Sequence, residues 1–153
     1  MNKLKLFTIA LLLTTGGFIL ITACNKADDP ASIIGSWKVT GAVFNPAYDP
    51  GSGLATDAYS LMFSQACSQD DLIIFQDNCT VINDEGALKC DSLSPQQSTD
   101  NYTLSGTNLT LISTTDTTTL TNVSIGTSTM SGTLSINFGG VAPANVDMTL
   151  TRQ

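Results

Sequence analysis

From Ile33 onward the sequence is a succession of short runs of β-forming residues separated by turn residues. The first run, GSWKVTGAVF at residues 35–44, alternates Trp37, Val39 and Val43 with residues that suit a solvent-facing side. This alternation is typical of a strand with one buried face. Short strands that follow one another this closely restrict the chain to an antiparallel β-architecture.

The later runs extend this pattern to the C-terminus. LIIFQ and CTVIN flank Asp77-Asn78, NYTL and LTLIS flank SGTN, TTTLTNVSI and TMSGTLSINF flank GTS, and NVDMTLTR ends the pattern. Strands joined by tight turns predict an up-and-down meander, either closed as a barrel or packed as a sandwich. Closure is favoured because it removes exposed strand edges. We therefore predict an all-β fold, an up-and-down antiparallel β-barrel of about eight strands.

One segment of the predicted domain has helical rather than strand periodicity. DAYSLMFSQAC, residues 57–67, predicts a short helix that Thr56 or Asp57 caps. Its shared face would consist of Tyr59, Met62, Phe63 and Ala66.

The N-terminus has the layout of an export signal. Lys3 and Lys5 precede an apolar run at residues 6–23. As a helix this run would be roughly 27 Å long, which is near the lower limit for crossing a bilayer, so a retained transmembrane anchor is the alternative. We divide the chain into a signal peptide (1–23), a tether (24–32) and a barrel domain (33–153).

The end of the apolar run, Ile21-Thr22-Ala23-Cys24, resembles the lipobox of bacterial lipoproteins. The resemblance implies that the Cys24 thiol receives a diacylglycerol, that the peptide is cut before Cys24, and that the new amino terminus is acylated by a fatty acid such as palmitate. Two or three acyl chains anchor a protein stably, whereas one does not. A plain signal peptide and a transmembrane helix are the alternatives.

The residues after Cys24 indicate to which membrane the protein would be sorted. Asn25, in place of Asp, argues against retention at the inner membrane. Lys26 and Asp28-Asp29 resemble the export signals of Bacteroidota lipoproteins, which implies a lipid anchor in the outer membrane with exposure at the cell surface. The alternative is a polar tether without address information.

The net charge of the chain excludes one class of binding partner. The chain has 153 residues and a formal charge of −7, and removal of residues 1–23 leaves four basic against 13 acidic residues, a charge of −9. So acidic a chain repels nucleic acid, which we exclude as a partner. The sequence contains no histidine, the commonest general base and metal ligand. We expect no metal and no cofactor.

The barrel segment resembles the lipocalin-like lipoproteins of Bacteroidota. The resemblance rests on Gly35-Ser36-Trp37, on CSQDDLIIFQDN followed by KCD, on YTLSGTNLTL, and on Arg152 after the last strand. It implies that Asp70 and Asp71 are structural. We interpret Trp37 and Arg152 as a plug at one barrel end, a cation over an aromatic face. The chain departs from the family at Asp77-Asn78-Cys79, where an Asp-Gly turn is usual.

Hairpin geometry selects one disulfide among the three cysteines of the domain. If LIIFQ and CTVIN pair about Asp77-Asn78, Cys67 and Cys90 lie just beyond the open end of the hairpin, while Cys79 lies at its turn. We therefore predict a Cys67–Cys90 bridge. Cys79 would remain as a buried or half-buried thiol without a catalytic role, since no basic group near it in sequence would lower its pKa.

The sequence offers few candidates for catalysis. Asp70-Asp71 and Asp84-Glu85 are the only acidic pairs suited to acid–base chemistry or Ca²⁺, and both occur where turns or caps are common. No phosphate loop, nucleophile elbow or Cys-x-x-Cys motif occurs. We predict that the protein is not an enzyme.

Two hypotheses of function remain. The first is a binding module that holds a small apolar molecule inside the barrel. The second is a non-catalytic interaction module with a filled barrel that docks a partner protein at the cell surface. The candidates for lining the interior are Trp37, Val39, Val43, Phe75, Val81, Leu104, Leu111, Ile136 and Phe138.

Overall fold

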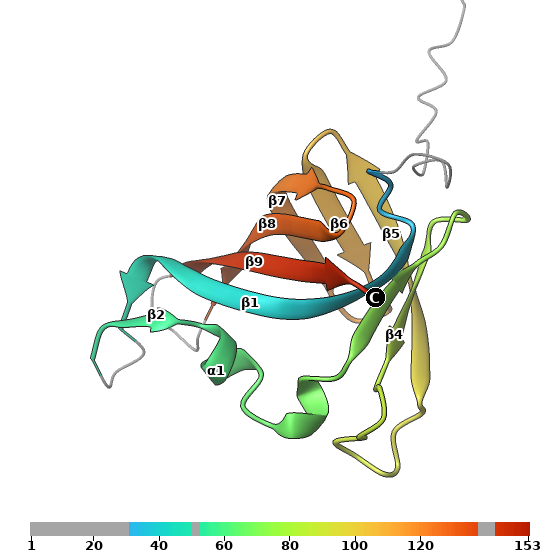
Figure 1. Cartoon of the computed structure of the whole chain (residues 1–153), viewed down its shortest axis with the longest axis horizontal. Coiled ribbons are helices and arrows are strands. Elements are labelled where there is room, and N and C mark those ends of the chain that lie inside the picture. Colours follow the sequence, from blue (N-terminus) through green and yellow to red (C-terminus); the bar gives the residue numbers. More distant parts are fainter. Residues whose placement is uncertain (1–30, 50–52, 138–142) are drawn as a thin grey trace, which may run out of the picture.

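The computed structural model describes residues 31–49, 53–137 and 143–153. In this part of the chain one antiparallel sheet closes on itself as a barrel (Figure 1). The barrel strands are β1 (Gly35–Tyr48), β3 (Leu72–Phe75), β4 (Thr80–Asp84), β5 (Gln97–Ser105), β6 (Asn108–Ile112), β7 (Thr117–Ile125), β8 (Thr129–Ile136) and β9 (Ala144–Arg152). A short strand, β2 (Ala55–Asp57), pairs with the far end of β1.

The connectivity is the predicted meander. From β3 to β9 each strand pairs with the next, and β1 pairs with both β3 and β9. The β3–β4 hairpin turns about Asp77-Asn78, with Phe75 opposite Val81. Because β9 returns to β1, the sheet is a closed eight-stranded barrel rather than a sandwich, and closure satisfies its edges.

A β-bulge in β1 changes which residues face inward. Val39 lies opposite Leu150 and Gly41 lies opposite Thr149, so Thr40 is an extra residue on β1. One extra residue reverses the alternation of side chains, as in any bulged strand. Val43 is consequently 51% exposed, which corrects its predicted inward orientation.

Ala42 and Phe44 take the inward positions after this bulge, and both are buried. Val43 shares the outer face with Asp147, its cross-strand partner. The Asp147 carboxylate accepts hydrogen bonds there from Asn45 Nδ2 at 2.7 Å and Thr133 Oγ1 at 2.8 Å.

The barrel end nearest residue 31 is sealed by Trp37 and Arg152, and we call it the closed end. The Arg152 guanidinium lies 4.2 Å from the centre of the Trp37 ring, in the arrangement of the predicted plug. Arg152 donates to the carbonyl oxygens of Ile34 at 2.6 Å, Thr127 at 2.9 Å and Ser32. Trp37 is fully buried, and its Nε1 donates to the Ile33 carbonyl at 2.7 Å. The segment before β1 is thereby fixed across this end.

The opposite end of the barrel carries the helical segment, and we call it the open end. The predicted helix over residues 57–67 is wrong in extent: the structure has a single turn, α1 (Tyr59–Met62), and a separate 3₁₀ turn, η1 (Ala66–Ser68). Asp57 accepts the Ser60 backbone N–H at 3.2 Å. So short a helix gains little from propensity alone, and the segment instead follows the barrel rim.

The helix ends after Met62, and the apolar side chains of this segment still reach the barrel core. Of the predicted face, Tyr59, Met62 and Phe63 pack against the core, whereas Ala66 is exposed. In the described part of the chain, no helix is both long enough and apolar enough to cross a membrane.

Candidate functional site

The barrel interior contains a cavity of about 530 Å³ that reaches the surface at the open end. Every one of the eight barrel strands contributes to its wall. The apolar lining consists of Val39, Met62, Phe63, Leu72, Ile73, Phe75, Pro95, Leu109, Leu111, Leu120, Met130, Leu134, Met148 and Leu150. On β6 and β9 the lining side chains alternate with outward-facing residues, as at Leu109 and Leu111 and at Met148 and Leu150, so much of the cavity follows from the period of the strands and from closure.

Met62 and Phe63 close part of the open end over this cavity. They come from the helical segment, whose aromatic pair Tyr59 and Phe63 stack with ring centres 5.0 Å apart. The Tyr59 hydroxyl donates to the Val39 carbonyl at 3.4 Å. The segment is therefore attached to β1, and it narrows the entrance without filling the interior.

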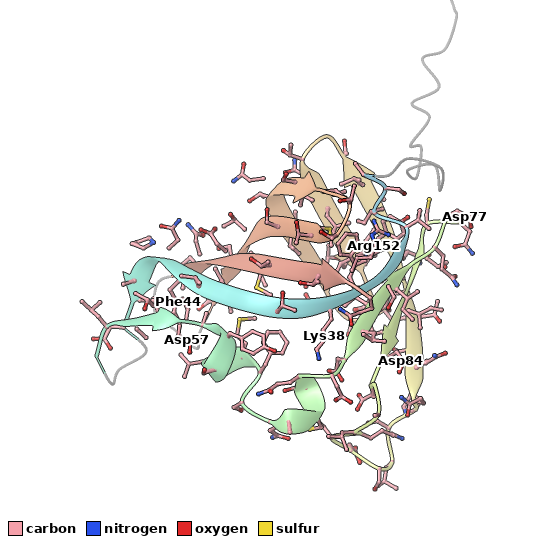
Figure 2. The ribbon with its side chains drawn as sticks, in the orientation of Figure 1. Lys38, Phe44, Asp57, Asp77, Asp84 and Arg152 are labelled. Atoms are coloured by element: carbon pink, nitrogen blue, oxygen red, sulfur yellow. A yellow bond between two sulfur atoms is a disulfide. The ribbon has the colours of Figure 1, made fainter. Side chains whose placement is uncertain are left out.

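Polar side chains surround the entrance to the cavity. We define the mouth as the polar lining residues at the open end: Ser68, Asp71, Asp84, Glu85, Ser94 and Ser98. Figure 2 shows Asp84 at this end of the barrel and Asp77 at the other. The cavity therefore has an apolar interior and an acidic entrance.

The three carboxylates of the mouth differ in their partners. Asp84 accepts hydrogen bonds from Gln97 Nε2 at 2.6 Å, Gln96 Nε2 at 2.9 Å and the Gly86 N–H at 2.9 Å. These bonds favour the ionised form and lower the pKa of Asp84, the Gln97 bond having the largest effect. Glu85 accepts the Cys90 N–H at 3.3 Å.

Asp71 lies in a less favourable environment for a charge. Its Oδ1 atom is buried and has no hydrogen-bond partner within the described residues. Burial raises the pKa of Asp71, and the negative charges of Glu85, Asp70 and Asp84 raise it further. Of the three carboxylates at the mouth, Asp71 is therefore the one whose negative charge the surrounding residues stabilise least.

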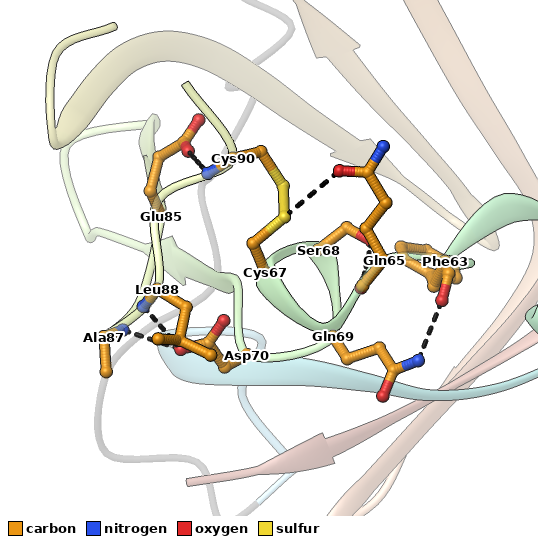
Figure 3. Close-up of a disulfide and its surroundings, with 10 residues drawn as sticks. All are labelled: Phe63, Gln65, Cys67, Ser68, Gln69, Asp70, Glu85, Ala87, Leu88 and Cys90. Carbon is orange, nitrogen blue, oxygen red and sulfur yellow. Dashed lines mark hydrogen bonds between the residues drawn. A yellow bond between two sulfur atoms is a disulfide. The ribbon is translucent and has the colours of Figure 1, made fainter. Parts of the chain in front are cut away.

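Asp70 performs the structural role that the resemblance implied for both aspartates. Its Oδ2 accepts the N–H groups of Ala87 at 2.7 Å and Leu88 at 3.0 Å (Figure 3). Gly86 has a φ of +63°, and a Cβ there would lie 2.5 Å from the Asp70 carbonyl oxygen. Asp70 therefore holds the loop after β4 against the rim, while Asp71 faces the cavity.

The predicted Cys67–Cys90 disulfide is present, with a Cα–Cα distance of 5.2 Å (Figure 3). It joins η1 to the loop between β4 and β5, on the rim of the mouth. Cys79 is half-buried at the β3–β4 turn and has a φ of +66°. It is not a free thiol in the structure, so the prediction of a spare thiol is wrong. Cys24 lies outside the described residues.

The structure separates the predicted lining residues into groups. Val39, Phe75 and Leu111 line the cavity. Trp37 and Val81 are fully buried at the closed end, and Leu104 and Ile136 pack against the core. Val43 faces outward, and Phe138 lies outside the described residues.

Sequence reasoning missed several cavity residues that a signal in the sequence could have identified. The alternation in NVDMTLTR places Met148 and Leu150 on one face, together with Val146. Met130 begins the same alternation on β8. Asp71 carried no such signal, because its approach to the cavity depends on the fold of the rim.

The cavity lining contains few groups of the kinds that hold metal ions or catalyse reactions. In residues 31–49, 53–137 and 143–153, no group of three His, Cys, Asp or Glu side chains could hold a metal ion. The polar lining consists of hydroxyl, carboxyl and amide groups. The arrangement is suited to enclosing an apolar molecule.

Comparisons with protein-family models, curated proteins and solved structures gave no match to this chain.

Proposed function

We propose that the barrel binds a small apolar molecule in its interior. The observation that carries this proposal is the cavity of about 530 Å³, whose wall is formed mainly by aliphatic, aromatic and methionine side chains. Sites for small ligands are typically concave, largely apolar and about 300–1,000 Å³ in volume. Burial of apolar surface would supply the affinity.

The same observation favours binding over the alternative, a barrel that only docks a partner protein. A docking module needs its outer face, and its interior would be expected to be packed to the density of an ordinary protein core. The proposed role is also non-catalytic. The cavity lining, as far as the structure describes it, has no lysine, arginine or cysteine, and the sequence has no histidine to act as a base.

We further propose that Cys24 is acylated and anchors the mature chain in the outer membrane, facing the cell surface. The lipobox-like residues 21–24 support this proposal. Residue 31 enters the barrel at its closed end, opposite the mouth. A tether from the membrane would therefore leave the entrance to the cavity accessible.

A pair of adjacent substitutions tests ligand binding. Leu134 lines the cavity, whereas its neighbour Ser135 is exposed on the outer face of β8. Leu134→Trp should fill part of the cavity and weaken the binding of a neutral naphthylamine dye by about tenfold or more, equivalent to about 1.4 kcal/mol. Ser135→Trp, the matched control, should bind the dye like the parent protein.

Dye fluorescence and calorimetry would report the affinities, and native mass spectrometry of protein purified from its own membrane would detect a natural ligand. Equal binding by both variants would place the dye outside the barrel. Absence of any dye binding to the parent protein would contradict the proposal.

A further inference from the structure

The charged side chains that line the cavity all carry the same sign. Asp71, Asp84 and Glu85 lie at the mouth, and the lining contains no lysine or arginine from the described residues. The remaining lining residues are neutral, and most of them are apolar. A molecule that enters therefore meets negative charge at the entrance and apolar surface beyond it.

The fold brings these carboxylates together. Leu72, the first residue of β3, pairs with Asp84, the last residue of β4. Asp71 precedes Leu72 and Glu85 follows Asp84, so the two residues extend the same pair of strands at the open end. The two carboxylates also repel each other: burial contributes most to the raised pKa of Asp71, and the charge of Glu85 is the next largest cause.

The described residues include three basic side chains, Lys38, Lys89 and Arg152, and none of them lines the cavity. Lys89, in the loop that borders the mouth, donates to the carbonyl oxygens of Ser92 and Ser94. Arg152 is engaged at the closed end. The buried Oδ1 of Asp71 accordingly lacks a donor within the described residues. The mouth is a site at which a positive charge would find acceptors.

We propose that the cavity selects cationic amphiphiles, with the apolar body inside the barrel and an ammonium group at the mouth beside Asp71 and Glu85. The inference rests on the proposed function and specifies its ligand class as alkyl or aryl amines. An ammonium group supplies the donors that Asp71 lacks, and charge-assisted hydrogen bonds are stronger than neutral ones. A carboxylate at the same place would meet like charges and lose its hydration.

Three ligands of equal chain length test this selectivity: decylammonium, decanol and decanoate at pH 7. Displacement of the naphthylamine dye would give their affinities. Decylammonium should bind about tenfold or more tighter than decanoate, with decanol in between. Binding of decanol without a preference for decylammonium would overturn the inference and leave the proposed function intact. Failure of all three ligands to bind would overturn both.

Variants locate the preference at the mouth. Asp71→Asn/Glu85→Gln should reduce the ratio of decylammonium to decanol affinity to near unity. Asp77→Asn removes one charge at the closed end, on an exposed turn residue, and should leave that ratio as in the parent protein. An equal fall of the ratio in Asp77→Asn would attribute the preference to overall charge and contradict a specific site. Retention of the full ratio in Asp71→Asn/Glu85→Gln would also contradict it.

Discussion

At the scale of single residues, neighbours in sequence have different roles because the chain alternates or turns between them. Asp70 binds the backbone of the loop after β4, whereas Asp71 lines the cavity. Asp71 also lacks a partner for its buried Oδ1 atom within the described residues. Such unfavourable placement of a charge is common where a protein binds a ligand, since binding sites are often not optimised for stability.

Asp71→Asn should stabilise the ligand-free protein at neutral pH. The pKa of Asp71 is raised in the folded state above its ordinary value of 3.8, so the ionised form opposes folding, and this cost disappears as the pH falls through the folded-state pKa. We expect a gain of up to about 0.5 kcal/mol in the free energy of unfolding at pH 7.

The gain from Asp71→Asn should be largely gone at about pH 3, below the ordinary aspartate pKa of 3.8, because the parent residue is then largely protonated in both the folded and the unfolded state. Urea titrations at the two pH values would measure it, with Asp77→Asn as the control for net charge. A gain that is the same at both pH values would contradict burial and like charge as its cause.

At the scale of secondary-structure elements, local sequence signals predicted the hairpins and the closure of the meander. Which side chains face inward also depends on β-bulges, which these signals did not predict. The turn at Asp77-Asn78 and the runs on either side fixed the β3–β4 pairing. Bulges are not encoded in hydrophobic alternation: Thr40 reverses the phase of β1, and Asn122, with a φ of +54°, does so in β7. Val123 is therefore buried where strict alternation from Leu120 would expose it.

The candidate site was predictable to the same extent. Val39, Phe75 and Leu111 lie on strands before any change of phase or on regular strands, and period-two reasoning placed them correctly in the cavity wall. Met62 and Asp71 belong to the rim, where a helical turn, a 3₁₀ turn and a disulfide determine the course of the chain. Their positions depend on tertiary contacts that no local pattern contains.

Removal of the rim disulfide should destabilise the protein and loosen the mouth. Cys67→Ser/Cys90→Ser frees a segment with a sequence separation of 23 residues. We expect a loss of about 3 kcal/mol in the free energy of unfolding on the chain-entropy estimate. The double variant is preferable to a reducing agent, because reduction would also act on Cys79, which is not a free thiol.

Denaturant unfolding would measure the loss on Cys67→Ser/Cys90→Ser, and hydrogen exchange would locate it. Amides in η1 and in the loop between β4 and β5 should exchange faster, while those around Trp37 at the closed end should change only with global stability. Unchanged exchange at the rim would show that Asp70 and its backbone partners hold the loop alone.

At the scale of the whole molecule, the two barrel ends are specialised. The closed end is sealed by Trp37 and Arg152 and receives the chain from residue 31, whereas the open end carries the mouth of the cavity. The formal charge of the whole chain is −7, and the mouth concentrates part of it. If the protein is anchored through Cys24, membrane attachment and ligand binding occur at opposite ends of the barrel. A mutation can then alter one of them without altering the other.

Cys24→Ala should separate attachment from binding. We expect loss of metabolic labelling by fatty acid and release of the protein from membranes, since the lipid would have no attachment site. Dye affinity should stay within about twofold of the parent value, because residue 31 enters the barrel at its closed end and the mouth of the cavity lies at the far end. Cys67→Ser/Cys90→Ser is the matched control, and it should remain labelled and membrane-bound.

Labelling that persists in Cys24→Ala would contradict acylation at this residue. The competing fate of Cys24 is a disulfide with another cysteine of the exported chain. One sulfur atom cannot hold a lipid thioether and a disulfide together, so non-reducing peptide mapping of the mature parent protein distinguishes the two. A lipid-modified peptide beginning at Cys24 supports the anchor, and a disulfide-linked peptide that contains Cys24 as the main product excludes it.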